Sequence, residues 1–214
     1  MSSEAAPASL SERSWFLRAL AALAAPQAIF VQLRDESEDA IEARTEPLFA
    51  ILTLASISVV LVSPTFRRML NDGSVSVLLI PVLAFIAGAI YAAFVYWGGG
   101  GLLFGAARRF GSEGTYLRAR HVVALAATPL AVSLLTFWPI RIAVYGEDLF
   151  RTGGDDYGRG DAIFGGVYLG FIAWSVWLLL VGVRAVHGWT WGRSAATVAL
   201  AAAFPVFIVL AAHH

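Results

Sequence analysis

The sequence predicts an all-α integral membrane protein with five transmembrane helices and a cytoplasmic N-terminus. The 214 residues are 58% hydrophobic and only 14% charged, whereas a soluble domain carries about 25% charged residues. Five apolar runs approach the roughly 20 residues that cross a bilayer, and none shows the period-2 alternation of strands. The arginines gather on one side of these runs, which predicts the orientation.

The segment before the runs, residues 1–46, is expected to be a cytoplasmic N-terminal segment. Within it, Ser14–Leu33 is apolar but is interrupted by Arg18 and Pro26. This pattern favours an interfacial helix on the inner leaflet, and a sixth span is the alternative. The acidic stretch Asp35–Glu46 is interpreted as a solvated linker, with docking of a partner as the second use.

The first run begins after a plausible helix start. Thr45 is expected to be the N-cap, Pro47 to lie in the first turn, and Pro64 to end the helix. The remaining runs follow at intervals that leave room for short turns, and residues 47–214 are therefore expected to form a transmembrane domain. The five runs are Leu48–Ser63, Val75–Trp97, Val122–Val144, Ile163–Val183 and Ala195–Ala212.

Small residues recur along the runs. The four glycines Gly98–Gly101 are expected to form a flexible helix end, since each lowers helix stability by about 1 kcal/mol. The series Ala84, Gly88, Ala92 and the pairs Gly101/Gly105 and Gly166/Gly170 are spaced four residues apart. Such spacing favours close helix contact, either within one subunit or in a homo-oligomer.

The positive-inside rule gives the orientation. Ten arginines lie before the first run or in the turns after the second and fourth runs, and five lie toward the other side. The richer side is expected to be cytoplasmic. Because the number of crossings is odd, the C-terminus is expected outside, in a multi-pass protein of a bacterial cytoplasmic membrane.

Two basic turns on the cytoplasmic side resemble each other. They read RFGSEGTYLRARHVVALAATP from Arg109 and RAVHGWTWGRSAATVALAAAFP from Arg184, with matching residues 75 positions apart. A duplicated hairpin and a coincidence of composition both explain this match. We regard six residues as candidate docking positions: Arg109, Thr115, Arg118, Arg184, Thr190 and Arg193.

The two threonines are expected to cap the helices that follow. An arginine three residues later then lies in the first helical turn, where the helix dipole disfavours a cation. An anionic lipid headgroup or an acidic group of a cytoplasmic protein would compensate. Alternatively, Arg118 and Arg193 act only as orientation signals.

Catalytic and cofactor chemistry find little support. Cysteine is absent, and His121 and His187 have no second ligand at metal-binding spacing on their helices. Ionisable groups are expected to be scarce inside the spans, apart from Arg141 near the outer end of the third. We therefore expect no enzyme, cofactor or metal, and the zero formal net charge gives no basic field for nucleic acid.

Four stretches together resemble the Yip family of Ypt/Rab-interacting membrane proteins, in its bacterial branch. They are PQAIFVQLRDES (26–37), EPLFAILTLASI (46–57), GSEGTYLRARHVVALAATPL (111–130) and GVRAVHGWTWGRSAA (182–196). The resemblance implies five helices with a cytoplasmic N-terminus. Eukaryotic members bind prenylated Rab GTPases, but their acidic aromatic entry motif is only loosely echoed by Glu46–Phe49, so Rab binding is not carried over.

The leading functional hypothesis is a non-enzymatic membrane organiser or adaptor that docks partners or lipids through its cytoplasmic hairpins. A small transporter, channel or lipid-handling protein is the alternative. An intramembrane enzyme is the third class, and a buried pair of ionisable or nucleophilic groups would favour it.

Overall fold

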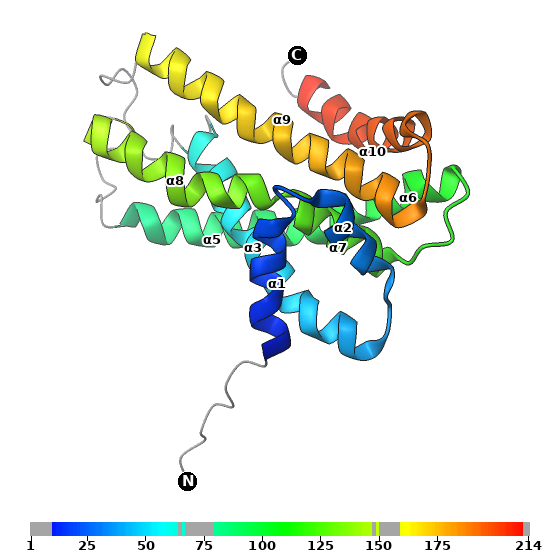
Figure 1. Ribbon diagram of the computed structural model, residues 1–214. Coiled ribbons are helices and arrows are strands. Elements are labelled where there is room, and N and C mark those ends of the chain that lie inside the picture. The colour runs from blue at the N-terminus through cyan, green and yellow to red at the C-terminus, as the bar shows by residue number, and fades with distance from the viewer. Residues whose placement is uncertain (1–9, 64–65, 67–78, 147–148, 150–158, 212–214) are drawn as a thin grey trace.

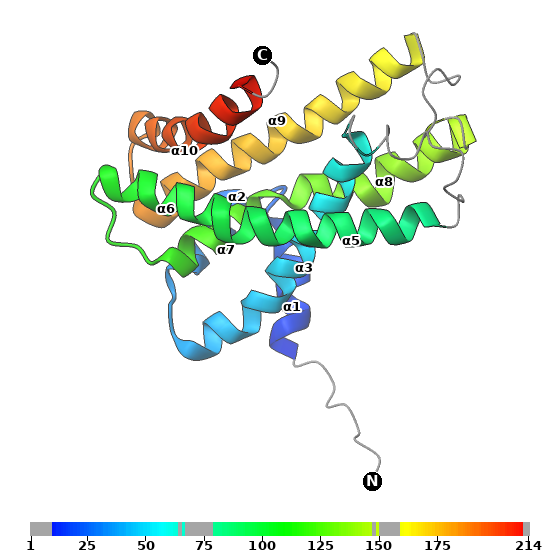
Figure 2. The ribbon, with the colours of Figure 1, turned by 180° about the vertical axis from the view of Figure 1, so that it is seen from behind.

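The computed structural model describes residues 10–63, 66, 79–146, 149 and 159–211, and every regular element among them is a helix. Figure 1 shows the long helices side by side with the short helix α1 crossing them, and Figure 2 shows the same arrangement from behind. The helices in chain order are α1 (Leu10–Ala21), α2 (Pro26–Val31), η1 (Gln32–Arg34), α3 (Glu38–Val62), α5 (Ile80–Ala93), η3 (Phe94–Gly99), α6 (Gly100–Arg109), α7 (Tyr116–Ala126), α8 (Thr128–Tyr145), α9 (Arg159–His187) and α10 (Trp191–Ala211).

Four helical segments are long and apolar enough to cross a membrane: Glu38–Val62, Ile80–Arg109, Tyr116–Tyr145 and Gly160–His187. The second joins α5, η3 and α6 without a break, and the third joins α7 and α8 at Ala127. They correspond to the first four predicted runs. The fifth run falls in α10, which has 21 residues, and its crossing stays a prediction.

The first long helix begins earlier than predicted. It starts at Glu38 after Ser37, which has an extended backbone, so Thr45 is not the N-cap and Pro47 lies well inside the helix. Glu38 and Asp39 occupy the first turn, where carboxylates are favoured by the helix dipole. Consequently α3 runs through the boundary expected between 1–46 and 47–214.

The glycine run Gly98–Gly101 lies inside a continuous helix and does not form a helix end. The π-helical turn η3 leads directly into α6 at this point. A Cβ at Gly100 would lie 3.1 Å from Cα of Arg120, so this glycine allows α7 to approach closely. Packing therefore explains Gly100, whereas a Cβ at Gly98 would meet no atom within 4 Å.

The expected single helix over Ser14–Leu33 is divided into α1, α2 and the short η1. At 12 residues, α1 is shorter than the roughly 20 residues that a crossing needs, so no single helix of this segment has the length of a sixth span. Trp15, Phe30 and Leu33 are buried in the core. A Cβ at Gly182 of α9 would lie 2.6 Å from the Phe30 ring, which shows how closely α2 packs on α9.

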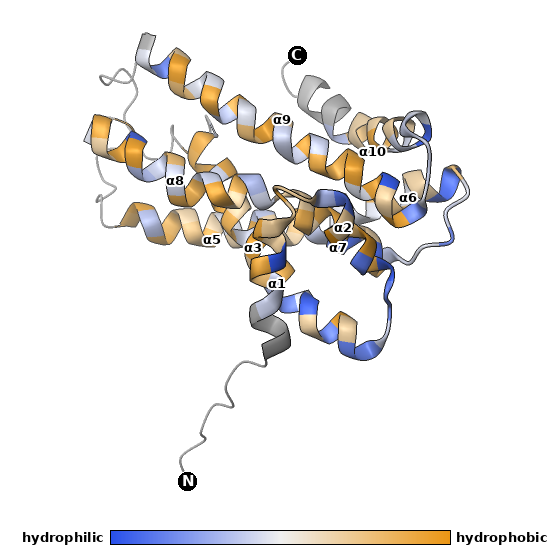
Figure 3. Cartoon of the chain, viewed as in Figure 1, coloured by the Kyte–Doolittle hydropathy of each residue, from blue (hydrophilic) through white to orange (hydrophobic). Residues whose placement is uncertain are grey.

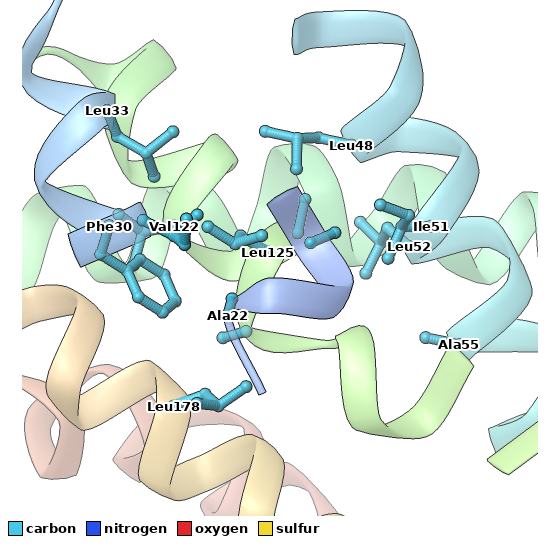
Figure 4. Close-up of a cluster of buried hydrophobic side chains, with 14 of the residues drawn as sticks. Ala22, Phe30, Leu33, Leu48, Ile51, Leu52, Ala55, Val122, Leu125 and Leu178 are labelled. Carbon is cyan, nitrogen blue, oxygen red and sulfur yellow. The ribbon is translucent and has the colours of Figure 1, made fainter. Parts of the chain in front are cut away.

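Two apolar cores hold the bundle together. The larger joins the N-terminal helices to α3, α7 and α9, and Figure 4 shows Phe30, Leu125 and Leu178 converging there. The smaller lies at the opposite end and includes Phe137 and Trp138. Outside the cores, the long helices carry exposed apolar side chains such as Phe94, at 71% exposure, as expected of surfaces that face lipid.

The small-residue motifs differ in whether another helix of the chain packs against them. Ala84, Gly88 and Ala92 are buried, and a Cβ at Gly88 would clash with Ile57 of α3, so this series mediates close contact within the chain. In contrast, a Cβ at Gly166 or Gly170 would meet no atom within 4 Å. Contact between subunits through this second pair stays a prediction.

Candidate functional site

The two predicted hairpins lie at the same end of the bundle, where hydrophilic residues gather (Figures 1 and 3). Each begins with a glycine at positive φ, which is 75° at Gly111 and 67° at Gly188. The following amides donate back across the helix end, from Ser112 N to the Ala107 carbonyl at 3.0 Å and from Trp189 N to the Arg184 carbonyl at 3.3 Å. Both helices therefore end in the same glycine-dependent turn.

The second helix of each hairpin begins with the expected threonine cap. Thr115 Oγ1 accepts the Arg118 amide at 3.1 Å, and Thr190 Oγ1 accepts the Arg193 amide at 3.5 Å. Both threonines are exposed. The shorter cap at Thr115 is the stronger one, because hydrogen bonds weaken toward 3.5 Å.

The tip of the α6–α7 hairpin is occupied by the chain's own N-terminal segment. The Thr115 hydroxyl donates to the Glu36 carboxylate, and Arg118 Nε lies 3.1 Å from Glu36 Oε1. Arg118 also donates to the Arg34 carbonyl at 3.4 Å. The compensating anion expected at Arg118 is thus Glu36, which sequence reasoning missed because 79 residues separate Thr115 from Glu36.

The same segment also contacts the α9–α10 hairpin. Arg34 Nε donates to the Ala185 carbonyl at 3.1 Å, and Arg34 Nη2 donates to it at 2.5 Å. Beside Arg34, the Ser37 amide donates to Asp35 Oδ1 at 3.0 Å and lowers the pKa of this exposed carboxyl. The linker between η1 and α3 therefore connects the two hairpins through charged and polar groups.

The tip of the α9–α10 hairpin has a different set of partners. Arg193 donates to the Phe110 carbonyl and lies over the Trp189 ring, 4.2 Å from its centroid. Trp189 in turn stacks on His187 with centroids 4.2 Å apart. No carboxylate among the described residues pairs with Arg193.

His187 joins the second hairpin to the first. Its Nδ1–H donates to the Val183 carbonyl at 2.9 Å, which leaves Nε2 to accept the Ser112 hydroxyl at 2.8 Å. The Ser112 oxygen then accepts the Gly114 amide at 3.0 Å. This chain of hydrogen bonds holds the two hairpins in register.

Arg109 and Arg184 are not structurally equivalent. Arg109 lies two residues before its turn glycine and is exposed, whereas Arg184 lies four residues before its glycine. Arg184 stacks over Trp191, 4.6 Å from the ring centroid, and Trp191 stacks on Trp177. The offset of 75 therefore relates the helix starts but not the helix ends, and the question of a duplicated hairpin remains open.

A buried polar network lies beneath the first hairpin. Arg44 and His121 are each 0% exposed, and Arg44 Nε donates to His121 Nδ1 at 3.0 Å. Because Nδ1 accepts, the proton is on Nε2, which lies 3.3 Å from Thr45 Oγ1; that hydroxyl donates to the Ile41 carbonyl at 2.7 Å. Arg44 enters the bundle because α3 begins early, at Glu38. It precedes the apolar run Leu48–Ser63, so the expected scarcity of ionisable groups inside the spans stays a prediction.

A second polar network lies toward the opposite end. Ser58 Oγ lies 2.7 Å from Ser133 Oγ and 3.3 Å from the Tyr168 hydroxyl, and it accepts Trp138 Nε1–H at 2.9 Å. Near it, the largely buried Arg141 pairs with Asp161 at 2.9 Å. The sequence gives no local signal for the bond between these two serines, because they are 75 positions apart.

In the described part of the chain, no cluster of three His, Asp or Glu side chains is placed to hold a metal ion. Both ring nitrogens of His121 and of His187 are engaged in hydrogen bonds. In addition, His121 Nε2 carries a proton and so is not a base for the Thr45 hydroxyl. The geometry gives these histidines positioning roles within the protein.

Comparison with known proteins identifies the family. Searches of curated proteins and of solved structures each found no match to this chain. The Yip1 domain family matches residues 20–213, a range that contains the hairpins, both polar networks and most of the N-terminal segment that contacts them. The chain therefore belongs to the Yip1 domain family of membrane proteins.

Proposed function

We propose that this protein is a non-enzymatic membrane organiser or adaptor that docks anionic lipid headgroups through its hairpin end. Supporting this, Arg109 and Arg193 are exposed, Arg193 reaches the Phe110 carbonyl of the other hairpin, and neither arginine pairs with a carboxylate among the described residues. Arginines attract anionic headgroups at about 1 kcal/mol each near a membrane surface. The exposed Arg193, which has no carboxylate partner among the described residues, is the observation that carries the proposal.

The proposal includes the orientation derived from the arginine distribution. Five spans cross a bacterial cytoplasmic membrane, with the N-terminus and the hairpin end inside and the C-terminus outside. Reporter fusions at residues 70, 113, 155, 190 and 214 test this arrangement. Cytoplasmic signal from the fusion at 155 or 214 would contradict it.

An enzymatic role is not proposed, although Arg44 and His121 are a buried ionisable pair. Catalysis by a histidine needs a free nitrogen near a nucleophile, and both nitrogens of His121 are used. The pair instead links α3 to α7. Its contribution is to hold the base of the first hairpin.

Lipid handling is the second candidate, and one observation favours it. An apolar groove between α3, α5 and α8 is lined by Ile57, Ile80, Ala84 and Leu134, among others. Its lining residues are all apolar, which suits an acyl chain. Transfer of a fluorescent phospholipid between vesicle populations, with and without the protein, tests this role.

The docking proposal is tested by native mass spectrometry of the detergent-solubilised protein titrated with phosphatidylglycerol. The double variant Arg109→Gln/Arg193→Gln is expected to weaken binding about thirtyfold, in line with two arginine contacts of about 1 kcal/mol each. The matched control is the double variant Arg118→Gln/Glu36→Gln, which removes an arginine together with its carboxylate partner and leaves the local net charge unchanged. Unchanged binding in the double variant would show that these arginines serve only as orientation signals.

A further inference from the structure

A groove lies between the start of α3 and the π-helical turn η3, away from the turn glycines. Four of its residues are spaced at 3, 1 and 3 along α3, which places them on one face of that helix. Two neighbouring aromatic residues of η3 form the other wall. The lining residues are Glu42, Thr45, Glu46, Phe49, Tyr96 and Trp97.

Three aromatic rings meet in this groove. The Phe49 and Tyr96 centroids are 5.3 Å apart at 78°, and the Tyr96 and Trp97 centroids are 5.5 Å apart at 85°. Phe49 and Trp97 are 6.0 Å apart. The rings thus present faces in different directions, and aromatic faces attract cations. Arg120, 5.0 Å from the Tyr96 centroid, already uses this property inside the protein.

Two carboxylates stand at the rim. Glu42 and Glu46 are one helical turn apart and exposed, and neither forms an ion pair with a described arginine. Carboxylates together with aromatic faces favour an occupant that is both cationic and partly desolvated. The groove therefore carries negative charge, whereas the hairpin end carries the positive charge of its arginines.

Tyr96 contributes its ring to the groove and not its hydroxyl. This residue is 3% exposed, and its hydroxyl oxygen is buried, so an occupant of the groove does not reach that oxygen. The hydrogen-bond acceptors open to the occupant are the two carboxylates at the rim. A primary ammonium has N–H groups to donate to them, whereas a trimethylammonium group has none.

The position of the groove indicates the source of the ammonium group. Glu46 lies near the start of the apolar part of α3, and the half-exposed Trp97 is of the type that anchors at a membrane interface. Headgroups of the surrounding bilayer reach this level. We propose that the groove binds the primary ammonium of a phospholipid headgroup, as in phosphatidylethanolamine.

The test is native mass spectrometry of the full chain in detergent, titrated separately with phosphatidylethanolamine, phosphatidylcholine and phosphatidylglycerol. The wild type is expected to bind phosphatidylethanolamine about fivefold more tightly than phosphatidylcholine. Glu42→Gln/Glu46→Gln is expected to remove that preference. The matched control is Glu38→Gln/Asp39→Asn, which removes two carboxylates from the same helix outside the groove and is expected to keep the preference.

Two further variants separate the contributions of the rings and the hydroxyl. Trp97→Leu is expected to weaken binding of both lipids, and Tyr96→Phe, which keeps the ring and removes a buried hydroxyl, is expected to leave the preference for the primary ammonium unchanged. Thermal unfolding of each variant shows whether it remains folded. If a variant unfolds, competition on the wild type by phosphatidylethanolamine against its N-methylated forms gives the same information.

Equal binding of phosphatidylethanolamine and phosphatidylcholine by the wild type would overturn the inference, as would an unchanged preference in the double glutamate variant. Displacement of the lipid by free ethanolamine at equal concentration would assign the groove to a soluble amine and would also overturn it. Phosphatidylglycerol binding depends on the hairpin arginines. Failure of that proposal and failure of this one are therefore distinguishable.

Discussion

The two hairpins at the arginine-rich end share their turn chemistry but differ in what contacts their tips. Each has a positive-φ glycine, a threonine cap and an arginine three residues later. In the α6–α7 hairpin the arginine and threonine bind Glu36 of the chain itself. In the α9–α10 hairpin the arginine rests on Trp189 and a backbone carbonyl.

This difference shows that two arginines in similar local sequences can differ in whether a carboxylate of the chain already neutralises them. The N-terminal segment neutralises one arginine and leaves the other without a carboxylate. The first hairpin is also supported from beneath by Arg44 and His121, whereas the second depends on His187 and stacked aromatic rings. Four experiments test this asymmetry, beginning with the largest expected effect.

The largest expected difference between the two hairpins is in the unfolding free energy lost when the histidine that supports each one is replaced. His121→Leu leaves Arg44 Nε without its acceptor, and the expected loss is about 2–3 kcal/mol of unfolding free energy, typical of a buried hydrogen bond to a charged group. His187→Leu, at a partly exposed site, should cost about 1 kcal/mol. Unfolding in mixed detergent–SDS titrations measures both losses. Equal losses would contradict the inference that His121 stabilises the first hairpin more than His187 stabilises the second.

The turn glycines should behave alike. Gly111→Ala and Gly188→Ala each place a Cβ at positive φ, and each should lower the unfolding free energy by about 1–2 kcal/mol. The same titrations measure these losses. Gly105→Ala, at a helical position with open space around it, is the control and should be neutral or slightly stabilising.

Removing Glu36 should leave Arg118 of the first hairpin without a carboxylate partner, as Arg193 is in the second. Glu36→Gln removes the carboxylate beside Arg118 and should increase phosphatidylglycerol binding about fivefold, since an arginine near the surface contributes about 1 kcal/mol. Native mass spectrometry measures the change. Glu113→Gln removes a nearby carboxylate that does not contact Arg118 and serves as control; an equal increase there would indicate a general charge effect.

The threonine caps should differ by the smallest amount. Thr115→Ala loses both the shorter cap and the contact with Glu36, and should cost about 1 kcal/mol. Thr190→Ala loses only the longer cap and should cost about 0.5 kcal/mol. Thr→Ser at either position keeps the hydroxyl and is the control. A larger loss at Thr190 would reverse the assigned order.

The periodic and local features of this protein were predictable from the sequence. Apolar runs predicted the long helices, and Thr115 and Thr190 were recognised as caps, because these signals depend on residues only a few positions apart. The start of α3 was misplaced. Thr45 and Pro47 form a good local start signal, but Ser37 followed by Glu38 and Asp39 forms an equally good one earlier in the chain.

The contacts that define the site were not predictable in this way. Glu36 meets Thr115, and Arg44 meets His121, across 79 and 77 residues. No periodicity or spacing rule connects positions so far apart. The glycines at 98–101 were misread for the same reason, since the close approach of Arg120 to Gly100 belongs to the packing of two helices.

The packing of Phe30 against Gly182 has a consequence for how the protein is assembled. The N-terminal segment is synthesised first, yet its docking surface is supplied by α9, about 150 residues later in the chain. During synthesis, Phe30 therefore lacks its final partner on α9 and is an exposed apolar group that a chaperone or the membrane surface must cover. Docking of this segment requires α9, so protease sensitivity of residues 22–37 would report whether a newly made chain has reached that stage of folding.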